Sequence, residues 1–129
     1  MNLFQKTIAQ PVSFQGTGLH SGKEVHVRLL PAEADSGIRF RRTDLQPAVE
    51  IPALAKYVGD TARSTSVRDA ATGASVGTIE HLMAAFAITG ICNLTVECDG
   101  EEFPILDGCS EQLLGYLHQA GIQKQRNIR

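Results

Sequence analysis

The sequence has few of the features that assign a chain to a specialised class of protein. Its 129 residues include only three cysteines, Cys92, Cys98 and Cys109. An odd number cannot pair completely, and no two of them form a C-x-x-C pair. A disulfide scaffold and a thiolate zinc knuckle are therefore not expected, and a reducing compartment is the simpler interpretation.

Charge of one sign and long apolar runs are also missing. The net charge is -2 at pH 7, and the basic residues after residue 123 are sparse, so we expect no nucleic-acid partner. No run of 18 apolar residues occurs, which predicts no transmembrane segment. The first ten residues contain neither a long apolar run nor a small-residue cleavage site, so we expect no signal peptide and a cytoplasmic protein.

What is present is the composition of an ordinary globular domain, with 43% hydrophobic and 20% charged residues. This length provides for one domain with one core. We assign residues 1–122 to that domain. Residues 123–129 are polar enough to be a tail or the start of a linker.

Alternation of apolar and polar residues predicts several strands. Val25, Val27 and Leu29 alternate with polar residues, as in a strand with one wet face. The turn formers of residues 16–23 join this strand to an extended segment before it, so the two form a hairpin. The predicted extended segments are Thr7–Phe14, with Pro11 favouring an edge position, Val25–Leu29, Ile38–Arg42, Ile51–Val58, Ser64–Val67 and Asn93–Cys98.

Two helices are predicted in the second half of the chain. The first has Thr78 as its N-cap, an apolar stripe of Ile79, Leu82, Met83 and Phe86, and a stop at Gly90. The second runs from about Ser110 to Ala120, with Leu113, Leu114 and Leu117 facing inward, and ends at Gly121. The order of elements predicts an α+β fold: a mixed, mostly antiparallel sheet with two helices packed on one face, a two-layer sandwich.

Glu80 and His81 carry the most chemical content. In the first turn of a helix the dipole stabilises a carboxylate and favours a neutral imidazole, which can bind a metal ion. Zinc acidifies a bound water, and Glu80 could take the proton. The alternative is a helix-starting glutamate beside a packed surface histidine, and the dipeptide alone favours that alternative.

Other patterns have competing interpretations. Residues 73–77 satisfy G-x-S-x-G around Ser75, followed by Asp107 and His118 in hydrolase order, but a polar turn precedes them where a buried strand is required. We interpret the pattern as a coincidence and His118 as a half-buried helix residue. Arg39, Arg41 and Arg42 either attract a phosphate or form a solvated strand face, the latter being favoured. His26 is expected on the wet face of its strand.

Four segments give the chain a specific resemblance. They are Gly18-Leu19-His20-Ser21-Gly22, Arg41-Arg42-Thr43-Asp44-Leu45, Thr78-Ile79-Glu80-His81-Leu82 and Pro104-Ile105-Leu106-Asp107-Gly108. Together they resemble, in order and over essentially the whole chain, the first domain of UDP-3-O-acyl-N-acetylglucosamine deacetylases, the zinc-dependent enzymes of lipid A synthesis. Cys109 departs from the serine usual in that family.

The resemblance implies roles for four residues. His81 would be a zinc ligand, and Glu80 would be the general base that activates water for attack on the acetamide. Asp107 would be a supporting acidic residue, and His20 structural or close to the substrate. The substrate would be a nucleotide-sugar lipid.

The family also has a second domain that carries further zinc ligands in an H-K-x-x-D motif and a histidine general acid. No H-K-x-x-D occurs in these 129 residues. With one zinc ligand where catalytic sites use three, we expect an incomplete site and no activity from this chain alone. The partner would be a second deacetylase domain or a homodimer copy. The alternative function is a non-catalytic relative that binds a nucleotide-sugar lipid or regulates a full-length deacetylase.

Overall fold

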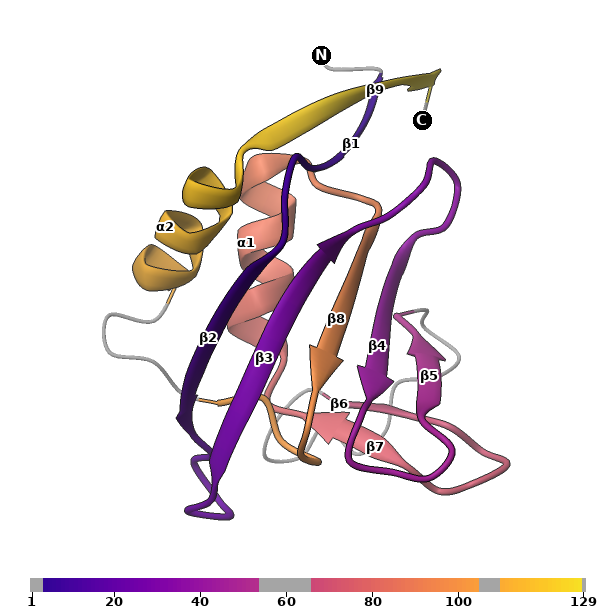
Figure 1. Cartoon of the computed structure of the whole chain (residues 1–129), viewed down its shortest axis with the longest axis vertical. Helices are drawn as coiled ribbons and strands as arrows, with labels where there is room; N and C mark the ends of the chain where they lie inside the picture. The colour runs from indigo at the N-terminus through magenta and orange to yellow at the C-terminus, as the bar shows by residue number, and fades with distance from the viewer. Residues whose placement is uncertain (1–3, 54–65, 105–109, 129) are drawn as a thin grey trace.

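The computed structural model describes residues 4–53, 66–104 and 110–128, and the side chain of Ser110 is outside the description. Figure 1 shows how the elements are arranged. In chain order they are β1 Phe4–Ile8, β2 Val12–Thr17, β3 Glu24–Pro31, β4 Ile38–Arg42, β5 Val49–Pro52, β6 Ser66–Arg68, β7 Ser75–Gly77, α1 Glu80–Thr89, β8 Leu94–Cys98, α2 Ser110–Ala120 and β9 Ile122–Ile128.

The central layer is a five-stranded sheet in the order β2-β3-β8-β4-β5. The predicted hairpin is confirmed, because β2 pairs antiparallel with β3 from Val12 opposite Leu29 to Thr17 opposite Glu24. Only β4 and β8 run parallel, and the other three pairings are antiparallel. The sheet is therefore mixed and mostly antiparallel, as the sequence predicts. Strand β2, which follows Pro11, lies at its edge, where proline is tolerated.

Both helices lie on one face of this sheet (Figure 1), so the predicted two-layer α+β fold is confirmed. Phe14 of β2 stacks on Tyr116 of α2, with ring centroids 4.5 Å apart. The two helices contribute Leu82, Phe86, Leu113 and Leu117 to the buried core, while Met83 and Leu114 are partly buried against it. No helix in the described part of the chain is long and apolar enough to cross a membrane.

The ends of α1 differ in how well the sequence predicts them. Gly90 takes a left-handed conformation, and its N–H donates to the carbonyl of Phe86, so the predicted stop is confirmed. The predicted N-cap is wrong: the cap position is Ile79, and no side chain caps it. Thr78 does not cap because its hydroxyl donates to a different partner, the carboxylate of Glu102.

The end of the described chain is a strand. Residues 123–128, which we expected to be a polar tail or the start of a linker, lie in β9 and pair antiparallel with β1. A buried amide network supports this pairing: the Asn93 side chain donates to the side-chain oxygens of Gln5 and Gln125, at 2.8 and 2.7 Å. A polar segment can therefore form this strand, because Gln125 finds a hydrogen-bond partner in Asn93, outside β9.

The helix–sheet core gives the first prediction. Leu117 is fully buried, so Leu117→Ala should lower the free energy of unfolding by roughly 2–5 kcal/mol through lost contacts and a residual cavity. Urea denaturation of the 129-residue chain measures this. Leu19→Ala is the matched control, since Leu19 is 60% exposed. An unchanged urea midpoint for Leu117→Ala would show that α2 is not part of the cooperative core.

Candidate functional site

Glu80 and His81 occupy the first turn of α1, where the sequence places them. Glu80 is partly buried and His81 is exposed. The backbone N–H groups of this turn make the positive end of the helix dipole, which stabilises an anionic carboxylate there. The turn is formed, since the Met83 N–H donates to the carbonyl of Ile79 at 2.9 Å. The side chains of Glu80 and His81 therefore project from a formed turn at the N-terminal end of α1.

A buried carboxylate, Glu102, joins this turn to the loop that contains His20. Its oxygens accept hydrogen bonds from the His20 N–H at 3.0 and 3.1 Å and from the Ser21 N–H at 3.1 Å. The Thr78 hydroxyl donates to it at 3.0 Å. The His20 imidazole lies 3.8 Å away. The structure thus brings the G-L-H-S-G segment and the T-I-E-H-L segment together around one side chain.

The backbone around Glu102 is unusually constrained. Thr78 is buried with φ at 60°, a left-handed conformation that a β-branched residue seldom adopts and that costs on the order of 1–3 kcal/mol. Opposite it, a Cβ on Gly18 would come within 2.5 Å of a Glu102 carboxylate oxygen. Only glycine lets the loop approach this closely. The site therefore depends on glycine at 18 and on a strained backbone at 78.

The third segment, R-R-T-D-L, reaches the same region through Arg42. The guanidinium of this buried residue bonds both carboxylate oxygens of Asp44, at 2.8 and 2.7 Å. It also donates to the carbonyl of Ser75 at 2.9 Å, in the strand that leads to Thr78. The hydrogen bonds from Arg42 hold the pKa of Asp44 below its usual value. Arg42 is thus structural and is not available to bind a phosphate.

Glu102 stays ionised although it is buried. Burial is the largest influence on its pKa and acts to raise it. Hydrogen bonds from the backbone of Ser21 and His20 and from the Thr78 hydroxyl, with the charge of His20, outweigh burial and hold the pKa below its ordinary value. The site therefore contains a fixed negative charge.

A hollow of about 390 Å³ opens beside this carboxylate. It is lined by His20, Ser21, Ser75, Gly77, Thr78, Glu101 and Glu102. Thr78 lies at its wall, two residues before Glu80. Of the predicted site residues in the described chain, His20 lines the hollow, whereas Glu80 and His81 lie beyond it on α1.

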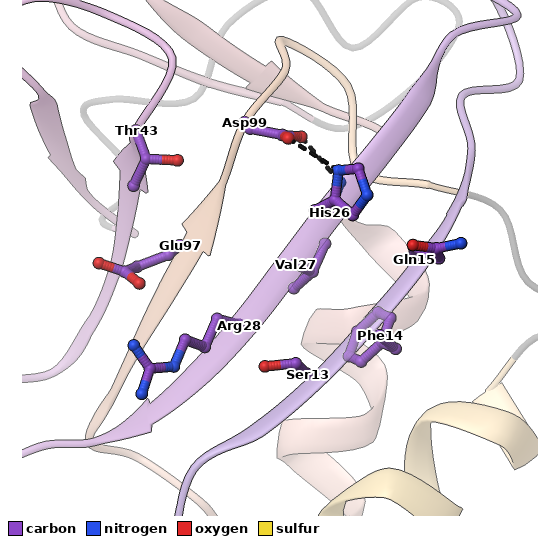
Figure 2. Close-up of a pocket in the computed structure, with 9 residues that line it drawn as sticks. All are labelled: Ser13, Phe14, Gln15, His26, Val27, Arg28, Thr43, Glu97 and Asp99. Atoms are coloured by element: carbon purple, nitrogen blue, oxygen red, sulfur yellow. Dashed lines mark hydrogen bonds and ion pairs between the residues drawn. The ribbon is translucent and has the colours of Figure 1, made fainter.

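A larger hollow, of about 420 Å³, lies on the open face of the sheet. Figure 2 shows its lining residues on β2, β3 and β8 and directly after the ends of β4 and β8, with α1 behind the sheet. His26 is exposed there as predicted, 2.9 Å from an Asp99 carboxylate oxygen and 3.3 Å from one of Glu24. Because none of His20, Thr78 and Glu102 lines it, this hollow is not the candidate site.

The remaining candidates have separate positions. Asp107 lies outside the described residues. Ser75 lies in β7, paired with β6, and no helix follows it directly. His118 is exposed on α2, not half-buried. Arg39 and Arg41 both pair with Glu50 on the open face of the sheet, which favours the solvated-face interpretation.

The described residues do not form a complete metal site by themselves. Among them, no group of three or more His, Cys, Asp or Glu side chains converges to hold a metal ion. His81 is exposed in the first turn of α1, so its imidazole is accessible to a ligand. Catalytic zinc uses three protein ligands. The described part of the chain therefore does not hold a complete catalytic zinc site.

Sequence reasoning missed Glu102. The stretch Asp99-Gly100-Glu101-Glu102 has the composition of a surface turn, and two adjacent glutamates suggest solvent exposure. The only available signal was position, since Glu102 comes directly before the Phe103-Pro104 step. A parallel bridge between Gly77 and Glu102 places the residue next to Thr78, and no local pattern encodes such a long-range pairing.

Comparison with known proteins adds independent evidence. Residues 5–129 match the family model described as LpxC: UDP-3-O-acyl N-acetylglycosamine deacetylase. Proteins named UDP-3-O-acyl-N-acetylglucosamine deacetylase from Myxococcus xanthus and Chromobacterium violaceum are similar to this chain at 50% and 48% identity. These alignments cover 94% and 98% of this chain but 38% and 43% of the relatives. The chain thus spans about two fifths of their length.

The charge of Glu102 predicts acid sensitivity. Its pKa is lowered by folding from an ordinary value of 4.5, so its contribution is present above that pH and is lost as the pH falls through the folded pKa. Glu102→Gln should therefore flatten the fall in the free energy of unfolding from about pH 7 to about pH 3. Urea midpoints across that range measure it. Glu101→Gln, at an exposed neighbour, should keep the wild-type slope; equal slopes in the two variants would contradict the prediction.

Proposed function

This chain belongs to the UDP-3-O-acyl N-acetylglycosamine deacetylase (LpxC) family, and we propose that it forms the first part of a zinc-dependent hydrolase. The complete enzyme removes the acetyl group of UDP-3-O-acyl-N-acetylglucosamine in lipid A synthesis. One observation carries the proposal: the segments around His20, Arg42 and Thr78, far apart in sequence, meet at the head of α1, where Glu80 and His81 project.

Glu80 is the general base in this proposal. Its carboxylate takes a proton from the attacking water as the new C–O bond forms at the acetamide carbonyl carbon. The C–N bond then breaks, acetate leaves, and the amine nitrogen takes a proton from a donor outside the described residues. His81 binds zinc, which when present polarises the carbonyl and acidifies water. His20 contacts the substrate from the hollow beside Glu102, and Asp107 is a supporting acid.

The rest of the centre has to come from another surface that docks beside His81. The exposed side of α1 is suited to such docking, because His81, Ala84 and Ile88 follow one another at helical spacing. Ile88 is 67% exposed. Beyond its first turn α1 has almost no charged residues, so this exposed side is largely apolar. We propose that a second deacetylase domain docks on this side of α1 and supplies the remaining zinc ligands and the general acid.

We place the reaction in the cytoplasm. Cys92 and Cys98 are free thiols in the structure, as a reducing compartment allows. Burial raises the pKa of the Cys98 thiol to about 11, so it stays protonated and unreactive. Neither thiol is part of the proposed chemistry.

Hydrolysis by the 129-residue chain alone is the first test. We expect no release of acetate from the acetylated sugar nucleotide, because in this proposal the general acid and two zinc ligands come from a second domain. Adding a separately expressed second domain of a relative should restore some turnover, and Glu80→Ala should abolish it. Glu111→Ala, at an exposed carboxylate on α2, is the control. Turnover by the pure chain that depends on Glu80 would instead indicate a homodimer sharing ligands across its interface.

Zinc binding is the second test. A single imidazole lacks the fixed tetrahedral ligand set that gives high affinity, so the monomer should lose zinc to a mild chelator. The NMR signals of His81 should nevertheless respond at lower zinc than those of His20, His26 or His118. A first response at His26 would remove the support for His81 as a ligand. Stoichiometric zinc surviving dialysis against chelator would contradict the incomplete centre.

A further inference from the structure

Glu102 has no role in the chemistry proposed above, yet it is among the most constrained side chains of the described chain. Glu102 is 6% exposed, and its two carboxylate oxygens accept four hydrogen-bond contacts. A buried carboxylate is stable only when its oxygens are bonded in this way. An apolar side chain would fill the same volume without that requirement, so the carboxylate is present for the groups that it holds.

The groups that it holds all lie next to candidate site residues. The Thr78 hydroxyl belongs to the residue two before Glu80, and the two N–H groups belong to His20 and its neighbour. Backbone bonds keep Glu102 itself in place, because the Gly77 N–H donates to the carbonyl of Glu101 at 2.9 Å and the Phe103 N–H to that of Gly77 at 2.8 Å. The carboxylate is therefore a fixed anchor, and Thr78 and the loop are attached to it.

Thr78 shows what the anchor does. Its left-handed backbone turns the chain from β7 into α1, and the helix begins at Glu80 without a side-chain cap. A threonine holds that conformation only when its surroundings impose it. The bond from its hydroxyl to Glu102 holds Thr78 directly before Ile79, the cap position of α1.

We propose that Glu102 is a positioning residue of the site: it fixes the first turn of α1, and with it Glu80 and His81, and fixes the His20 loop against that turn. This inference rests on the proposed function only in assigning a catalytic use to the positioned residues. The positioning itself can be measured without metal or substrate.

The test compares two amides at opposite ends of α1 in the 129-residue chain. The Met83 N–H closes the first turn on Ile79, and the Gly90 N–H closes the last turn on Phe86. Glu102→Gln places an amide where the carboxylate accepted N–H donors. We expect hydrogen exchange at Met83 to rise about tenfold relative to Gly90, as local opening of one end predicts. A purely stabilising role would raise both rates equally through global unfolding.

Three further variants make the result decisive. Glu101→Gln removes the same charge at the exposed neighbouring position and should leave the exchange ratio unchanged. Adding Thr78→Gly to Glu102→Gln should restore part of the Met83 protection, since glycine adopts a positive φ without an imposed constraint. Thr78→Val replaces the hydroxyl by a methyl group and so removes the bond to Glu102. Should Glu102→Gln fail to fold, the Met83-to-Gly90 exchange ratio in Thr78→Val tests the positioning role.

The outcomes separate this inference from the proposed function. An unchanged Met83-to-Gly90 ratio in Glu102→Gln or, if that variant does not fold, in Thr78→Val overturns the positioning role, whatever the chain catalyses. A selective rise at Met83 supports it even if no deacetylase activity is found. With the second domain added, Glu102→Gln should lower kcat more than it raises KM, because misplaced Glu80 affects the reaction step.

Discussion

The candidate site depends on the hydrogen bonds that the buried carboxylate of Glu102 accepts. This carboxylate is ionised and buried, and it remains so because the His20 and Ser21 N–H groups and the Thr78 hydroxyl all point at it. These partners are 24 to 82 positions away along the chain. The bonds join the loop of His20 and Ser21 to Thr78, from which the backbone leads through Ile79 into α1. A charge that would be costly alone thereby becomes the feature that organises its surroundings.

The five-stranded sheet makes that convergence possible. The β4–β8 pair runs parallel, from Ile38 beside Leu94 to Arg42 beside Cys98. The loops that leave these two strands therefore emerge at the same end of the sheet. Arg42 at the end of β4 reaches Ser75, and the chain after Cys98 carries Glu102 to Gly77. The site is thus assembled at the edge where these strands end.

Glu80, the proposed general base, and His81, the proposed zinc ligand, lie at the positive end of a helix. Among the described residues, no group of three or more His, Cys, Asp or Glu side chains converges to hold a metal ion. The exposed apolar positions of α1 continue directly from His81 along the helix. The proposed function therefore involves two neighbouring parts of α1, its first turn and the exposed side that follows His81.

Local rules determined much of this protein. Alternation predicted β3, β4 and β8, the helical stripe predicted α1 and α2, and Gly90 and Gly121 predicted where the two helices end, because each depends on neighbours within a few residues. Motif resemblance predicts Glu80 as a general base and His81 as a zinc ligand, and these two roles stay predictions. Tertiary structure alone decided three features: β9 is a strand because β1 pairs with it, Thr78 is bonded to Glu102 where local rules predict a cap, and Glu102 is buried. In each case the deciding partner lies far away in sequence, where periodicity and propensity carry no information.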